Sequence, residues 1–277
     1  RMQGASAAAS LPALHLDATA NLAGTSAKVQ VQADAGSKLA LNVAGTAPLS
    51  STGPVNLRTN GHLDLAIANG YLGAQARQAL GQVQLALLVA GTMSAPRITG
   101  TVDLQNADIQ DFAQGVHLSA INGHIVGQGN SIVIQSLTAK AGDGTMSVSG
   151  SVGMLAPGIP VDIHFIARDA RPISSDLITA VMNADMIIKG QATAQMDVAG
   201  NVDLRKVEIN IPNSLPSSVA RLDVIRPGDK TQTDAAAEEN ASASVIGLNL
   251  TVTSPGKFFV RGHGLDAEMA GRLKVKG

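Results

Sequence analysis

The side chains of this chain that could bind a metal ion or move a proton are mainly histidines and aspartates. None of the six histidines occurs in an HxH or HExxH spacing, and the sequence has no cysteine, so the usual zinc-ligand patterns are absent. Most of the histidines fall in the polar phase of strand-like segments. We therefore interpret them as solvated side chains. They are His15, His62, His117, His124, His164 and His263.

Aspartates gather at Asp103, Asp108 and Asp111, and Asp162 lies two residues from His164. Catalysis by such groups needs an oriented nucleophile or a second partner, and the sequence has no G-x-S-x-G elbow and no G-x-G-x-x-G loop. The sequence therefore predicts a protein that is not an enzyme and that has no metal site and no cofactor.

Composition limits the possible ligands. Lysine and arginine (20 residues) balance aspartate and glutamate (21), and there is no tryptophan. Nucleic acid is excluded as a partner, because the chain has neither a basic excess nor enough stacking side chains. Hydrophobic residues still make up 45 % of the 277 residues, although only 2 % are aromatic. No stretch reaches 18 apolar residues, and we expect any membrane anchor or targeting segment to lie outside this sequence.

The elements that must position these residues are strands, because apolar and polar residues alternate over most of the sequence. In residues 191–204, for example, Met196, Val198, Val202 and Leu204 belong to one phase. Such one-sided alternation is typical of antiparallel sheets. Two segments could hold helix. Residues 172–182 keep the alternation and are interpreted as strand, whereas residues 72–80 could form a helical turn.

Glycine recurs at fixed distances inside these strands. Segments 98–104, 148–154 and 198–204 share the pattern x-Gly-x-Val, with Gly100, Gly150 and Gly200 spaced 50 residues apart. Glycine within a strand favours a bend or a close backbone approach, so the repetition favours an elongated sheet. We expect about 18 to 22 strands of ordinary length. They form β-groove repeats over residues 1–228 that continue over 245–277, with a flexible loop at 229–244.

The apolar rows leave two architectures open. They could fill the core of a β-sandwich or a β-solenoid, although such cores usually contain large aromatic residues. Alternatively, they could line the concave face of a single curved sheet that stays partly open. An open apolar groove would need a ligand, and acyl chains fit a lining without fixed polar groups.

The end of the sequence carries a family resemblance. The words FFVRGHGL (258–265) and GRLKVKG (271–277) resemble the TamB C-terminal domain of the AsmA-like superfamily, and segments 91–107 and 142–152 resemble its repeated strand–turn unit. The resemblance implies an all-β, curved, mostly antiparallel sheet that forms a taco-shaped groove with an apolar interior. It also implies a periplasmic location and a parent protein anchored in the inner membrane of a Gram-negative bacterium. The implied partners are phospholipid and TamA or a related outer-membrane assembly barrel.

Our leading hypothesis is a conduit in which phospholipid acyl chains lie on the apolar phase, although alternation alone does not say which phase is concave. The alternatives are a chaperone-like module that holds outer-membrane protein strands and an adhesin-like passenger with a filled core. The residues expected to face the groove and bind lipid are Val83, Leu85, Leu87, Val89, Ile98, Val102, Leu104, Met146, Val148, Val161, Ile163, Phe165, Met196, Val198, Val202, Leu204, Leu248, Leu250 and Val252.

Overall fold

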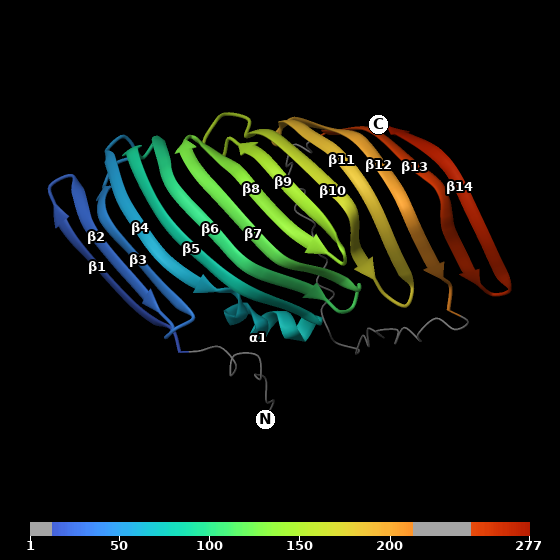
Figure 1. Cartoon of the computed structure of the whole chain (residues 1–277). Helices are drawn as coiled ribbons and strands as arrows, with labels where there is room; N and C mark the ends of the chain where they lie inside the picture. The colour runs from blue at the N-terminus through green and yellow to red at the C-terminus, as the bar shows by residue number, and fades with distance from the viewer. Residues whose placement is uncertain (1–12, 213–244) are drawn as a thin grey trace, which may run out of the picture.

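A computed structural model describes residues 13–212 and 245–277, which form one sheet of 14 strands lying side by side in sequence order (Figure 1). The strands are β1 (His15–Ala23), β2 (Ser26–Asp34), β3 (Leu39–Pro48), β4 (Pro54–Asp64), β5 (Arg77–Thr92), β6 (Ala95–Asp111), β7 (Val116–Gly129), β8 (Ser131–Ala141), β9 (Gly144–Val152), β10 (Pro160–Ser174), β11 (Ile178–Gln191), β12 (Gln195–Asn210), β13 (Val245–Gly262) and β14 (Leu265–Lys276).

Neighbouring strands are antiparallel, except that β12 and β13 run parallel. The hairpin of β8 and β9 is shorter than its neighbours, and Ile173 of β10 pairs with Val116 of β7 beyond it. The sequence-based prediction of an all-β, elongated, mostly antiparallel sheet is therefore confirmed.

The strands are fewer and longer than the sequence suggested. We expected about 18 to 22 strands of ordinary length, whereas the described residues form 14, of which β13 has 18 residues. The strands continue through their bends instead of ending there, so that β5, β6, β12 and β13 have 16 to 18 residues. At about 4.8 Å between strands, the sheet extends on the order of 60 Å across its strands.

The structure decides between helix and strand for the two stretches that the sequence left open. Residues 172–174 end β10 and residues 178–182 begin β11, as the alternation predicted, whereas residues 175–177 connect the two strands instead of continuing one. The expected helical turn occurs between β4 and β5 as η2 (Leu65–Ala68), α1 (Asn69–Leu72) and η3 (Gly73–Gln75), and Arg77 already begins β5. The expected flexible loop at 229–244 lies outside the described residues.

The sheet is a single layer in the part of the chain that the structure describes. Its extensive contacts join neighbouring strands, together with contacts of β10 with β7 and β8 and of the helical turns with β5. The buried core is correspondingly small: a cluster of Ala141, Ala167, Ala170 and Ala184, on which Met186 and a few other partly buried side chains pack. This arrangement is not the filled sandwich or solenoid of the alternative interpretation.

Each long strand is bowed along its length, so that the sheet has the shape of a trough (Figure 1). The strands contain β-bulges, where one residue has no direct partner in the neighbouring strand, and a bulge bends the strand that holds it. The bulges shift the pairing register between Leu104 and Ala107 in β6, between Ala167 and Ala170 in β10 and between Asp203 and Val207 in β12. They thus form a row across the sheet that marks its fold line.

Three of the bulges, in β6, β10 and β13, have the same backbone conformation. Asn106, Asp169 and Lys257 have positive φ values of 47°, 45° and 61°. In each case, a side-chain oxygen of an adjacent strand accepts a hydrogen bond from the bulged N–H group. The acceptors are Asn122 at 3.0 Å, Asn183 at 2.6 Å and Glu268 at 3.0 Å. Because a backbone donor needs a partner, these acceptors replace bonds that the sheet loses at each bend.

The recurring glycines allow neighbouring strands to approach each other closely. Gly100, Gly150 and Gly200 have φ values of 113°, 139° and 150°, which side chains rarely allow. A Cβ atom at each would lie 2.0–2.2 Å from a carbonyl oxygen of the neighbouring strand. The expectation of close backbone approach at these positions is therefore confirmed.

Candidate functional site

The candidate site is the apolar face of the trough. Cα partners across a sheet point to the same side, so the pairing register defines which residues share a face. One continuous row crosses nine strands, from β5 to β13. Its residues are Val83, Leu104, Gly123, Leu137, Val148, Phe165, Met186, Gly200 and Leu250.

The register places all nineteen residues of the expected set on this face. They come from β5 (Val83, Leu85, Leu87, Val89), β6 (Ile98, Val102, Leu104), β9 (Met146, Val148), β10 (Val161, Ile163, Phe165), β12 (Met196, Val198, Val202, Leu204) and β13 (Leu248, Leu250, Val252). Their role in lipid binding remains a prediction.

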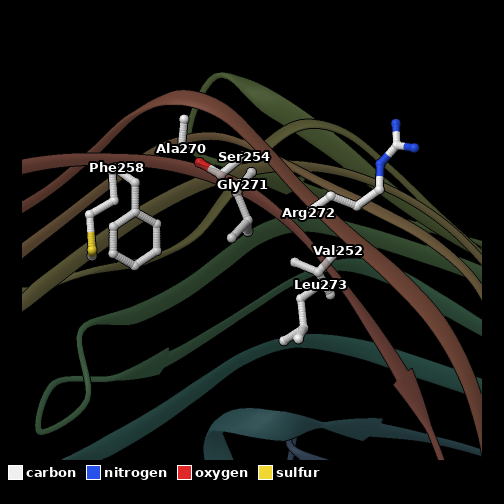
Figure 2. Close-up of a pocket in the computed structure, with 9 residues that line it drawn as sticks. Val252, Ser254, Phe258, Ala270, Gly271, Arg272 and Leu273 are labelled. Carbon is white, nitrogen blue, oxygen red and sulfur yellow. The ribbon is translucent and has the colours of Figure 1, made fainter.

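Figure 2 shows that this face is the inner side of the trough, at β13 and β14. Val252, Phe258 and Leu273 lie beneath the arch of these strands, whereas Arg272 extends from the opposite side. We call the two sides the inner face and the outward face. The inner face continues into β14 through Leu273 and Val275, which are opposite Val252 and Leu250.

The inner face is almost free of polar side chains. Its positions from β2 to β13 carry aliphatic residues, methionine, phenylalanine, proline and glycine, with hydroxyls at Thr59 and Ser254 and the ion pair of Arg77 and Asp111 at one end. The Oγ atom of Ser254 is buried and has no hydrogen-bond partner. Such a lining can bind hydrocarbon without fixing its position, because it offers few directional contacts.

Large apolar side chains are open to solvent on this face. Leu16, Leu22 and Leu273 are 63 %, 73 % and 61 % exposed, and no large side chain among the described residues is fully buried. Near β14 the inner face forms a hollow of about 330 Å³, lined among others by Leu204, Phe258 and Met269. Contiguous exposed apolar surface of this kind usually marks a binding site for lipid or protein.

The outward face carries most of the histidines and aspartates that the sequence drew attention to, whereas Asp111 lies on the inner face and His263 in the turn before β14. The three clustered aspartates do not contact one another, because each pairs with a different residue. Asp103 pairs with His124 at 2.5 Å, and Asp108 pairs with His117 at 2.9 Å. Asp111 pairs with Arg77 at 2.8 Å, at one end of the inner face. His164 pairs with Asp185 at 2.7 Å rather than with Asp162, which pairs with Lys189.

These pairs link adjacent strands and are mostly exposed. Arg77 donates a hydrogen bond to Asp111 and thereby holds the pKa of that carboxyl below its ordinary value, and the N–H of Gln114 adds to the effect. Within the described ranges, no three His, Asp or Glu side chains gather closely enough to hold a metal ion. No helix in those ranges is long and apolar enough to cross a membrane.

Sequence reasoning missed the bulges that keep the inner face continuous. Their signal is present as a spacing of three instead of two between apolar residues, for example Leu104 to Ala107, Ala167 to Ala170 and Leu204 to Val207. At these places the extra residue restores the apolar phase to the inner side after the bend. The same spacing from Leu118 to Ile121 accompanies the bulge in β7.

Comparison with known proteins agrees with this architecture. The chain matches no curated protein and no solved structure. The family model of the TamB C-terminal domain matches residues 135–277, more than half of the chain, which run from the middle of β8 to the end of β14. This family is associated with TamA in the translocation and assembly module of the cell envelope. The chain therefore belongs to the TamB C-terminal domain family.

Proposed function

We propose that the inner face is a non-enzymatic, periplasmic conduit for phospholipid, in which acyl chains lie along the trough while head groups stay in water. In the full-length parent, which we place in the inner membrane, the conduit carries lipid towards the outer membrane and a TamA-type barrel. The observation that supports this proposal is a continuous apolar face that no second layer covers in the described residues.

The energetics suit transport. Each buried methylene contributes about 0.8 kcal/mol, so an acyl chain on this face is held by many small, non-directional terms. Few hydrogen-bonding side chains interrupt the face, the hydroxyls of Thr59 and Ser254 among them. A chain can therefore shift by one row without breaking a specific contact. This combination of retention and mobility is what a conduit requires.

Paired variants test the proposal. Val198→Asp places a charge on the inner face, whereas Ala199→Asp places the same charge one residue away on the outward face. Leu250→Glu and Thr251→Glu form a second pair. We expect the two inner variants to lose phospholipid in native mass spectrometry and lipid cross-linking, and the two outward variants to retain it. Equal lipid capture by all four folded proteins would contradict the conduit.

A second candidate function, a chaperone for outer-membrane strands, is favoured by the edge of β14. Leu248 and Gly277 exchange both backbone hydrogen bonds, so in the alternating antiparallel pattern Lys274 directs its N–H away from β13. This edge pairs with no other strand among the described residues. An extended polypeptide could therefore add to it as a further strand.

Lys274→Pro removes this outward N–H without disturbing the bonds to β13, and Lys274→Gln removes only the charge. If the chaperone function holds, proline but not glutamine abolishes binding of an extended outer-membrane protein peptide. Both variants should keep zwitterionic lipid on the inner face. Peptide binding that survives proline would exclude strand addition at β14.

A further inference from the structure

The C-terminal part of β14 carries three positive charges on its outward face. Arg272, Lys274 and Lys276 occupy three successive outward positions, and all three are exposed. Elsewhere in the described sheet, several cations are paired, as Arg77 is with Asp111 and Lys189 is with Asp162. The three β14 cations form no ion pair with any described residue.

The neighbouring strand does not neutralise this charge. The residues opposite the three cations on β13 are neutral: Thr253, Thr251 and Asn249. On the next strand, Asp203 of β12 is opposite Thr253 and already contacts Arg205 at 3.5 Å. This end of β14 therefore carries unpaired positive charge on its outward face, in a chain whose net charge is −1.

The apolar and cationic surfaces meet at this strand. The inner hollow of about 330 Å³ and a polar hollow of about 980 Å³ share four lining residues: Ser254, Ala270, Gly271 and Arg272. Leu273 and Val275 face inward between cations that face outward. The same residues Arg272, Lys274 and Lys276 direct their N–H groups towards the unpaired edge, by the alternation that starts at Leu248 and Gly277.

We propose that β14 binds the phosphate of an anionic phospholipid at its edge and outward face, while the acyl chains of the same molecule lie in the inner hollow. This inference rests on the proposed lipid conduit and adds a preference for head groups with net negative charge. Guanidinium, ammonium and backbone N–H groups provide charge-assisted hydrogen bonds to the phosphate oxygens, and Phe258, Met269 and Leu273 contact the chains.

A zwitterionic lipid of the same chain length gains less from this site. Its phosphate carries the same charge, but its own quaternary ammonium repels the three cations and already screens the phosphate. A lipid whose head group is otherwise uncharged keeps the whole attraction. Because the groups are exposed, this attraction is weakened by salt, whereas the contribution of the chains is not.

The test uses this chain and three probes: dioctanoylphosphatidylglycerol, dioctanoylphosphatidylcholine and inorganic phosphate. The variant R272Q/K274Q/K276Q removes the β14 charge. The matched control K28Q/R58Q/R97Q removes the same charge from β2, β4 and β6, where these outward cations also form no ion pair within the described ranges. Isothermal titration calorimetry gives the affinities, and thermal melting verifies that each variant is folded.

We expect the unmodified chain to bind the anionic lipid about tenfold more tightly than the zwitterionic one, and the β14 variant to lose this preference while it keeps its affinity for the zwitterionic lipid. The control variant should retain the preference, and about 500 mM salt should abolish it. Equal affinities of the unmodified chain for the two lipids, or a preference for the anionic lipid that survives in the β14 variant, would overturn this inference but not the lipid conduit. Phosphate that binds as tightly as the anionic lipid would overturn the lipid as occupant. Binding of neither lipid would contradict the conduit itself.

Discussion

The backbone N–H of Asp169 donates a hydrogen bond of 2.6 Å to Oδ1 of Asn183, which reaches across from β11 to the bulge in β10. Removing the acceptor leaves a backbone donor that only water can satisfy. We predict that Asn183→Ala lowers the free energy of unfolding by about 1 kcal/mol in urea denaturation. Asn201→Ala is the matched control, because Asn201 also lies on the outward face and its side chain has no hydrogen bond among the described residues. Equal losses in both variants would refute a special role for the bulge acceptor.

Gly200 tests the close approach of β12 and β11. A Cβ atom there would lie 2.2 Å from the carbonyl oxygen of Asp185, and the residue has a φ of 150°. We predict that Gly200→Ala costs about 1–3 kcal/mol of stability. Gly271→Ala, also on the inner face, should cost little, because a Cβ atom there has nothing within 4 Å. Thermal and chemical denaturation compare the two variants. Equal stabilities of Gly200→Ala and Gly271→Ala would contradict the prediction, because the strands could then separate at Gly200 without cost.

The pair of Arg77 and Asp111 should make stability depend on pH. The pKa of Asp111 is lowered in the folded protein, mainly by its hydrogen bond from Arg77. Its stabilising contribution is therefore present above the ordinary value of 3.8 and is lost as the pH falls through the lowered value. We predict that Arg77→Gln moves the pKa of Asp111 back towards that ordinary value in an NMR titration. The difference in melting temperature between the unmodified chain and Asp111→Asn should shrink on acidification, and a constant difference would disprove the linkage.

Strand β1 should be the least protected described part of the sheet. All nine of its residues are exposed, and it pairs only with β2, whereas β11 is hydrogen-bonded to both β10 and β12. Local opening of an edge strand breaks the hydrogen bonds to one neighbour only and exposes little buried surface, so its free-energy cost is low. We predict faster hydrogen–deuterium exchange in peptides from β1 than in peptides from β11. Similar protection would show that something else covers β1 in solution.

Much of the fold was predictable because it rests on local pattern. Alternation around Met196 and Val198 predicted the strand, although β12 pairs antiparallel with β11 and parallel with β13, and Gly150 and Gly200 predicted close backbone contacts. The described residues form 14 strands where about 18 to 22 were expected, because strands such as β10 continue through a bulge, here after Ala167. Pairings across long distances, such as that of His164 with Asp185, have no local signature.

The sequence by itself determined that each strand has an apolar side and a polar side, since side chains alternate with a period of two and burial of apolar surface is favourable. Only the tertiary structure decided that these sides join into one inner face. A shift of a single residue in register would turn a strand over, and bulges such as those at Asn106 and Asp169 bend the strands while they keep Leu104, Ala107, Ala167 and Ala170 on the same side. Which side becomes concave depends on where these bends fall across all the strands together, and no single segment of the sequence contains that information.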